Sequence, residues 1–437
     1  MLAILRQRNF ALLWTAGLIS MTGDWVLIVG LPVEIYRRTG STLATAGMVL
    51  SFLVPSIVLG SIAGVFVDRW DRRRLMIVVD LLLAACLLPL LAVDSVGLWV
   101  AYLVLIASSS LDQLFSPAEI ALLPNLLEGS EEQLVTANAL SGMNRHLSRI
   151  VGPAIGGVAV AAGGLVAVAV LDAASFLVAA VLITAIRVDP RRAAALAAAG
   201  RTSVAAAATS LEAAATSTWS RLRREWREGL AYVVRQPILR ALLVFFVITR
   251  TGEGLTATLF VPWATDALHT DASGYGWLLS TQAIGGIVGA VLVGRMGTRI
   301  DPLRLLIVGG TMFGLIDLVL FTYPAVFPYL PPALVGMVIV GVPGAAMGAA
   351  IATLQQTQAP DSHRGRVVGG LVAAGAIGSL VGAIAAGLLG EVVPVIPLLV
   401  VQGSGYTIGG LLVLFMTRHL RGSTPVSPAA VEDSDPT

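Results

Sequence analysis

Long apolar runs separated by short polar segments repeat along almost all of the 437 residues. Each run has about 20 residues or more, which is the length a helix needs to cross the hydrocarbon core of a membrane. The runs do not alternate between apolar and polar residues, as the strands of a membrane β-barrel do. The pattern therefore predicts an all-α polytopic membrane protein with twelve transmembrane helices. The predicted spans are residues 10–36, 43–66, 75–93, 97–122, 136–162, 164–186, 238–264, 273–294, 304–323, 332–356, 367–390 and 395–417.

One polar segment, 188–236, is much longer than the others and divides the chain into two six-helix halves. We predict an N-terminal half over 1–187 and a C-terminal half over 237–420, joined by 188–236 as a cytoplasmic linker. Residues 219–232 of this linker have the basic, amphipathic pattern of a helix that lies on a membrane surface. The residues 421–437, rich in Ser, Pro and acidic side chains, predict a disordered cytoplasmic tail.

The two halves also repeat each other in sequence. The second span ends in GSIAGVFVDRWDRRRL and the eighth in GAVLVGRMGTRIDPLRL, and each pairs a small-residue helix end with a basic turn. RIVGPAIGGVAVAAGG in span five corresponds in the same way to IGSLVGAIAAGLLG in span eleven. Duplicated halves related by an axis along the membrane normal are typical of transporters.

The basic residues predict the orientation of the chain. All 28 are arginines, and most fall in segments that are cytoplasmic if the N-terminus is cytoplasmic, whereas Arg37 and Arg38 lie in an outer loop. Cytoplasmic loops carry the excess of positive residues. We therefore predict a multi-pass protein of the inner (plasma) membrane with both termini in the cytoplasm. The first apolar run is too long for the core of a cleavable signal peptide.

Composition excludes several classes of protein. Hydrophobic residues make up 56% of the chain and charged residues 12%, whereas a soluble domain carries about 25% charge. The net charge is only +2, and the arginines form no basic face with aromatic platforms, so nucleic-acid binding is not expected. With a single cysteine, Cys86, and no GxxxxGK or HExxH motif, we expect no enzymatic activity, no catalytic residues, no cofactor and no metal site.

Four charged residues fall near the middle of predicted spans, where a charge is costly and is therefore a candidate for function. Asp24 lies in span one, Asp112 in span four, and Arg250 and Glu253 in span seven. Arg250 and Glu253 are three residues apart and share a helix face, so they are also compatible with a self-satisfied ion pair. Helix-packing hydrogen bonds are the corresponding alternative for Asp24 and Asp112.

The turn after span two is a candidate latch on the cytoplasmic side. Asp68 can accept hydrogen bonds from a facing helix end and from an arginine, and Gly64, one turn earlier, permits close helix approach. Arg69, Arg72 and Arg73 extend this turn. The alternative is that these arginines only anchor the inner face.

Span five combines a proline with small residues. Pro153 removes a helix hydrogen bond, and Gly152, Gly156 and Gly157 leave a small-residue face. Such a helix can bend and can pack tightly against a neighbour. Packing alone also explains the pattern.

These motifs together resemble the major facilitator superfamily, and within it the branch of drug and siderophore exporters that includes macrolide-efflux and enterobactin-exporter-like proteins. The resemblance rests on the run from Gly64 to Arg74, on Thr22-Gly23-Asp24-Trp25, and on the Gly-Pro-x-x-Gly-Gly element at 152–157, and it covers about residues 5–420. The sequence departs from the superfamily signature at Asp71, where the signature has a glycine.

The resemblance implies that spans one, four, seven and ten line a central cavity, so that Asp24, Asp112, Arg250 and Glu253 couple protons to transport. It also implies that the Gly-Pro element marks an antiporter. The same family arrangement places Asp80, Asp172 and Asp317, on spans three, six and nine, at the periphery, where structural pairing is expected. We further expect a monomer whose partners are a small-molecule substrate, protons and the lipid bilayer.

The sequence thus predicts a secondary active transporter that exports small amphipathic molecules of the drug or siderophore class by proton antiport through alternating access. Two alternatives within transport are a lipid or glycolipid flippase and an importer of the same fold. A third alternative is a membrane sensor or scaffold that keeps the fold without transport.

Overall fold

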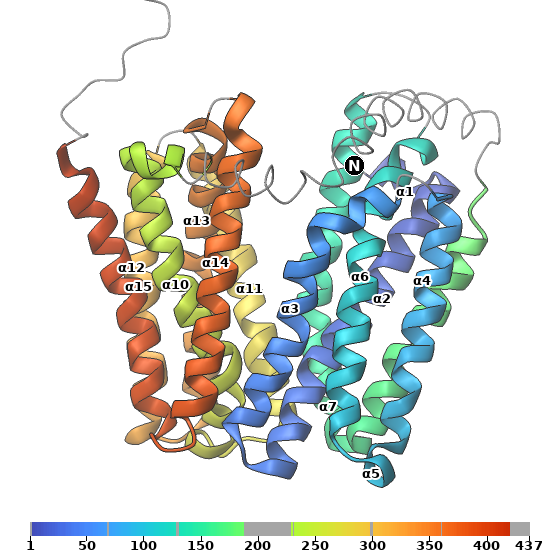
Figure 1. Ribbon diagram of the computed structural model, residues 1–437, viewed down its shortest axis with the longest axis horizontal. Coiled ribbons are helices and arrows are strands. Elements are labelled where there is room, and N and C mark those ends of the chain that lie inside the picture. The colour runs from blue at the N-terminus through green and yellow to red at the C-terminus, as the bar shows by residue number, and fades with distance from the viewer. Residues whose placement is uncertain are drawn as a thin grey trace, which may run out of the picture.

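The computed structural model describes residues 2–67, 70–127, 131–187, 229, 231–297, 300–359 and 361–419. Nearly all of these residues are helical, and the long helices stand side by side in two groups (Figure 1). The first group contains α1 (Leu2–Leu5), α2 (Arg8–Thr39), α3 (Thr42–Val67), α4 (Arg72–Leu87), η1 (Leu88–Ala92), α5 (Val93–Val96), α6 (Trp99–Leu126) and α7 (Glu131–Thr184). The second contains α10 (Pro237–Pro262), η2 (Trp263–Ala267), α11 (Ala272–Met296), α12 (Pro302–Thr322), η4 (Tyr323–Ala325), α13 (Leu330–Thr357), α14 (Asp361–Leu389) and α15 (Val395–Thr417).

Ten helices in the described part of the chain are long and apolar enough to cross a membrane, which confirms the polytopic all-α prediction. One of them, α7, has 54 residues and, if straight, would extend about 80 Å at 1.5 Å per residue. It is interrupted at Gly163 and Gly164, and Gly164 has a φ of 58° that favours glycine. Two predicted spans, 136–162 and 164–186, therefore meet at this turn. The seventh predicted span forms α10, which is outside the ten, so the exact number of twelve stays a prediction.

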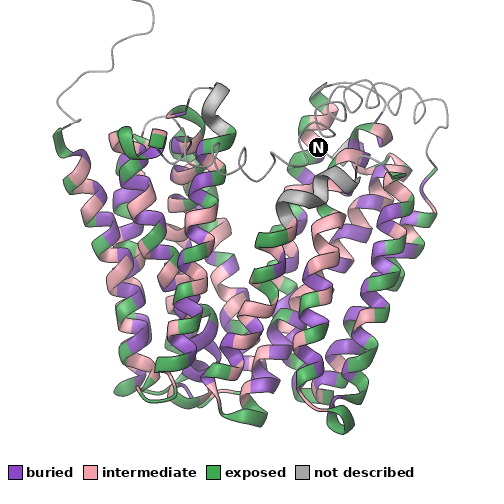
Figure 2. Cartoon of the chain, in the orientation of Figure 1, coloured by how far each residue is buried: buried purple, intermediate pink, exposed green. Residues whose placement is uncertain are grey.

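Burial follows the expectation for helices in lipid. Buried residues lie mainly inside each helix group and exposed ones mainly on its outside (Figure 2). Large apolar side chains such as Val181, Val319 and Phe415 are among the exposed residues. A soluble protein rarely leaves so many large apolar residues exposed. The outer surface is therefore suited to contact with lipid chains.

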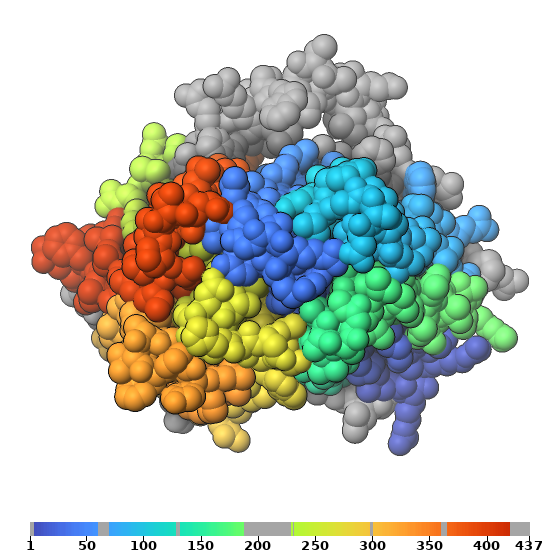
Figure 3. All heavy atoms as spheres, turned by 90° about the horizontal axis from the view of Figure 1, so that it is seen from below, coloured from blue at the N-terminus to red at the C-terminus, as the bar shows by residue number. Residues whose placement is uncertain are grey.

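The two groups contact each other at one end of the bundle, which we call the closed end. It is the end at which α2 connects to α3 and α14 connects to α15 (Figure 1). There α7 packs on α11, and α3 packs on α14 and α10, and the surfaces of α3, α7, α11 and α14 meet in the view from below (Figure 3).

The other end, which we call the open end, lacks such packing among the described residues. A Cβ added at Gly294 on α11, or at Gly365 or Gly369 on α14, would meet no neighbouring described atom within 4 Å. Gly294 lies near the end of α11 and the other two near the start of α14, and these helix ends lie on the side of the bundle where the N-terminus is found (Figure 1). The structure therefore represents a state in which the groups are joined at one end only.

Candidate transport site

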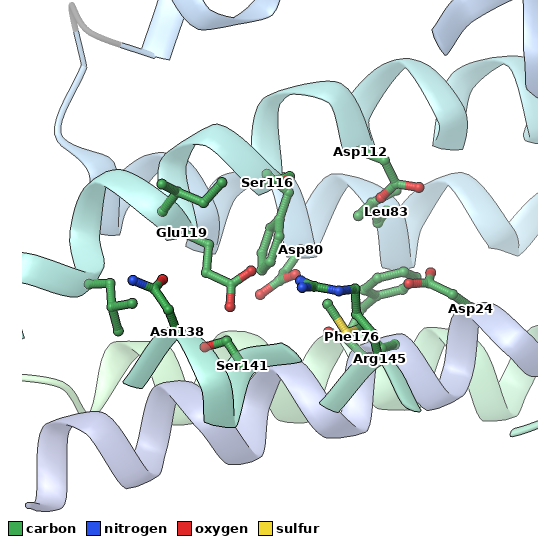
Figure 4. A pocket seen from close by; sticks show the side chains of 15 residues that line it. Asp24, Asp80, Leu83, Asp112, Ser116, Glu119, Asn138, Ser141, Arg145 and Phe176 are labelled. Atoms are coloured by element: carbon green, nitrogen blue, oxygen red, sulfur yellow. The ribbon is translucent and has the colours of Figure 1, made fainter. Parts of the chain in front are cut away.

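A cavity of about 410 Å³ lies inside the first helix group, between α2, α4, α6 and α7 (Figure 4). Four carboxylates and one guanidinium give it its chemical character. These are Asp24 on α2, Asp80 on α4, Asp112 and Glu119 on α6, and Arg145 on α7. The rest of the lining is formed by Ser20, Met21, Leu83, Phe115, Ser116, Ile120, Leu123, Asn138, Ser141 and Phe176.

Helical spacing places several of these residues on one face. Asp112, Ser116 and Glu119 are separated by four and three residues and therefore point to the same side of α6. Asp80 and Leu83 share a face of α4 in the same way. Each helix thus contributes its polar stripe to the cavity.

A glycine brings a further carboxylate close to Asp24. A Cβ at Gly23 would lie 2.5 Å from Oδ1 of Asp172 and 2.1 Å from Oγ of Ser175, so α2 and the second part of α7 touch here. The hydroxyl of Ser175 donates to the backbone oxygen of Asp172 at 2.8 Å. Oδ2 of Asp172 has no hydrogen-bond partner among the described residues.

Within the described part of the chain, the carboxylates of the cavity have no hydrogen-bond or ion-pair partner. Both carboxylate oxygens of Asp80 are buried without a hydrogen-bond partner in the described part of the chain. Among the described residues, no ion pair within 4.0 Å joins Arg145 to any of the cavity carboxylates. The described residues also contain no group of three or more His, Cys, Asp or Glu side chains that fits a metal ion. The arrangement is suited to the exchange of protons for a charged ligand.

The four residues expected to line the central cavity lie in two places. Asp24 and Asp112 line the cavity, whereas Arg250 and Glu253 lie on α10 in the second group. Arg250 and Glu253 form an ion pair of 2.5 Å, and the hydroxyl of Tyr406 donates to Glu253 at 2.9 Å. The guanidinium of Arg250 also lies 5.6 Å from the ring centre of Phe246. This geometry matches the alternative of a self-satisfied pair.

Sequence reasoning missed Asp80, Glu119 and Arg145 as members of this site. The structural pairing expected for Asp80 is wrong, because neither of its oxygens has a partner among the described residues. The pairing expected for Asp317 is confirmed, because the amide of Gln402 donates to it at 2.8 Å. The high cost of charges in membranes is the signal that could have found all three residues. It was applied to Asp80 but not to Glu119 or Arg145, and the family arrangement places Asp80 at the periphery.

The predicted latch is only partly within the described residues. Gly64 lies in α3, whereas Asp68 and Arg69 lie outside the described part. Arg72 donates to the backbone oxygen of Ala121 at 3.2 Å. Arg73 donates to the oxygens of Ile183, at 3.1 Å, and Thr184.

Both latch arginines therefore bond within the first group. Arg73 contacts the last carbonyls of α7, where a positive charge is favourable. At Asp71, the position that departs from the superfamily signature, the side chain accepts from the backbone nitrogen of Arg74 at 2.8 Å and caps α4. In this conformation, the basic turn fastens α4 to α6 and α7.

The small-residue face of span five packs on two different helices. A Cβ at Gly152 would lie 2.3 Å from Cβ of Trp25, and one at Gly156 would lie 3.0 Å from Cα of Val26, both on α2. A Cβ at Gly157 would lie 2.5 Å from the backbone oxygen of Ala272 on α11.

The contact with α11 continues at Pro153. Its backbone oxygen would be 2.2 Å from a Cβ added at Gly276. Together, Gly157, Pro153 and Gly276 hold the two groups together at the closed end.

Polar contacts reinforce the closed end. Glu391, in the loop between α14 and α15, accepts from the backbone nitrogen of Leu43 at 3.0 Å and from the hydroxyl of Ser41 at 2.7 Å. These bonds, above all the backbone bond, lower the pKa of Glu391. The hydroxyl of Tyr36 likewise donates to Asp266 across the groups. The ionised form of Glu391 thus stabilises the first turn of α3.

The architecture is that of a polytopic α-helical membrane protein. The nucleoside transporter NupG has the same fold, with a TM-score of 0.73 at 10% identity over 93% of this chain and 99% of that one. The chain matches the family described as transmembrane secretion effector (MFS_3) over residues 1–427. The protein therefore belongs to this family of the major facilitator superfamily.

Two relatives with named activities cover most of the chain. The multidrug efflux pump Tap of Mycolicibacterium fortuitum is 29% identical over 386 residues, which are 86% of this chain and 85% of Tap. The enterobactin exporter EntS of Citrobacter koseri is 25% identical over 435 residues, which are 94% of this chain and 92% of EntS.

Proposed function

We propose that this protein exports small amphipathic molecules of the drug or siderophore class in exchange for protons. The cavity carries this proposal, because its carboxylates have no pairing partner among the described residues and lie inside a fold shared with transporters. Membership of the secretion effector family and the similarity to Tap and EntS support export. Proton exchange is the mechanism that buried carboxylates of this kind supply.

In the proposed mechanism, Asp24 and Asp112 hold protons when no substrate is present and lose them when substrate enters. In alternating access, the two helix groups then separate at the closed end and come into contact at the open end. Gly64, Asp68 and Arg69 form the latch in that second state, and Arg72 and Arg73 move with the first group. Arg250 and Glu253 serve as a second charged site that faces the substrate path.

Everted membrane vesicles provide the test of export. In such vesicles an exporter should accumulate substrate inside when the interior is acidic, and a protonophore should abolish the accumulation. Suitable probes are tetraphenylphosphonium, a macrolide and a catecholate siderophore. A membrane sensor would show no gradient-dependent flux for any probe, an importer would show the opposite direction, and a flippase would move only labelled lipid. Each of these results would overturn the proposal.

The finer features of the membrane assignment belong to the same proposal. We place the protein as a monomer in the lipid bilayer of the inner membrane, with the closed end outside and both termini in the cytoplasm. The domain boundaries at 187, 237 and 420, and the cytoplasmic linker between the halves, complete this arrangement.

Thiol labelling of intact cells checks the orientation. After replacement of Cys86 by alanine, Thr39→Cys at the end of α2 should react with an impermeant maleimide from outside. Ser203→Cys in the linker should react only after the membrane is permeabilised. The reverse pattern would contradict the orientation and the cytoplasmic position of the latch.

A further inference from the structure

Asp80 is the most deeply buried of the four carboxylates that line the cavity. Its relative exposure is 0%, and both oxygens are without a hydrogen-bond partner among the described residues. Figure 4 shows its carboxylate pointing into the same space as Glu119, Asp24 and Arg145. A buried carboxylate in this situation must either carry a proton or receive a positive charge from a ligand.

The charges that face Asp80 favour a cation. Asp24 comes from α2, Asp112 and Glu119 come from α6, and Arg145 comes from α7, so four acids oppose a single guanidinium. Asp172, which lies against Gly23 on α2, adds a fifth carboxylate beside the cavity. An anionic ligand would meet repulsion from most of this lining. A cation would gain the partner that Asp80 lacks.

The remaining lining fits the body of such a ligand. Phe115 and Phe176 supply aromatic rings, and Met21 and Leu83 supply aliphatic surface. Aromatic faces attract cations as well as apolar groups. The volume of about 410 Å³ lies within the range of small-molecule sites.

We propose that the cavity inside the first helix group is a binding site for an organic cation and that Asp80 is its anchoring carboxylate. The ligand class is a positive charge, such as an amine or onium centre, attached to an apolar or aromatic body. This proposal rests on the proposed function and selects the cationic drug class over an anionic siderophore. It also places the site inside one helix group rather than between the two.

Binding of the cation should be linked to protons. A carboxylate that holds a proton in the empty site releases it when the cation binds. The net charge of the site then stays the same, because one proton leaves for each positive charge bound. Binding should therefore weaken as the pH falls. The other charged groups in or beside the cavity are the carboxylates of Asp24, Asp112, Glu119 and Asp172 and the guanidinium of Arg145.

Equilibrium binding to the purified full chain in detergent tests the site. Radiolabelled tetraphenylphosphonium is the probe, because its charge does not depend on pH. We expect Asp80→Asn to weaken binding about tenfold or more and to reduce the proton release measured with a pH indicator dye. Asp317→Asn is the matched control, since Asp317 is a buried aspartate of the second group with its own partner, and it should bind as the native protein does.

Two further measurements keep the test decisive. Asp80→Glu retains the charge and should recover part of the binding, which separates loss of the anchor from loss of folding. Tetraphenylborate, the anion of the same shape, should not compete. Native binding by Asp80→Asn, equal loss in Asp317→Asn, or effective competition by tetraphenylborate would overturn the proposal.

Export assays separate this proposal from the proposed function. A protein that exports a neutral or anionic compound but does not bind tetraphenylphosphonium overturns the cation site alone. Binding that depends on Asp80 without any gradient-dependent flux overturns the exporter assignment alone.

Discussion

Asp24→Asn should abolish uphill export while leaving substrate binding and downhill exchange partly intact. Asp24 lies 16 residues after the start of α2 (Arg8–Thr39), which is about 24 Å along the helix and close to its middle. Asparagine has nearly the same shape as aspartate but cannot ionise, so the variant imitates the protonated state permanently. A carrier held in that state can still change conformation but can no longer exchange protons for substrate.

The measurement compares two fluxes in everted vesicles. Accumulation against a gradient should fall about tenfold or more in Asp24→Asn, because mid-membrane carboxylates are the expected proton carriers. Counterflow of labelled substrate without a proton gradient should persist. Glu253→Gln is the informative comparison, because Glu253 already has Arg250 and Tyr406 as partners, and it should reduce uphill export less. Unaltered uphill export in Asp24→Asn would remove this residue from the mechanism.

The places of the membrane helices in the chain followed from local sequence properties. A span needs only its own length of apolar residues, so the predicted ranges agree with the helices of the structure. The boundary between spans five and six is a clear case, since the predicted break at 162–164 coincides with the turn at Gly163 and Gly164. Spacing also revealed the Arg250–Glu253 pair, because three residues along a helix bring two side chains to one face.

The residues that line the cavity were harder to predict from the sequence, because the lining depends on which helices pack together. Asp24 and Asp112 were identified by the cost of their charges, but the same cost applies to Asp80 and Arg145. Only the packing of α4 and α7 around α2 and α6 reveals that all four line one space. The partners of Arg73 are likewise invisible in sequence, since Ile183 and Thr184 are more than 100 residues away.

The contact of α7 with α11 leads to the second large effect. Replacing Gly276 by leucine should force the closed end apart and convert the protein to a state open at that end. A Cβ at Gly276 would lie 2.2 Å from the backbone oxygen of Pro153, and a backbone oxygen cannot rotate away as a side chain can. Each group keeps its own core, so the variant should remain folded and inserted in the membrane. Export should fall by about tenfold or more, because the added side chain cannot be accommodated by small local shifts at a fixed backbone contact.

Labelling of a reporter cysteine at the closed end measures this opening. Ser273→Cys lies beside Gly157 at the contact, since a Cβ at Gly157 would be 2.8 Å from Cα of Ser273. With Cys86 replaced by alanine, the reporter should react much faster with a membrane-impermeant maleimide when Gly276→Leu is present. Gly286→Leu is the matched control on the same helix, because a Cβ there meets no described atom within 4 Å, and it should leave the labelling rate unchanged. Labelling at the native rate in Gly276→Leu, or equally accelerated labelling in Gly286→Leu, would show that the glycine contact does not hold the closed end together. The polar bonds of Glu391 and Tyr36 would then be the contacts that hold it.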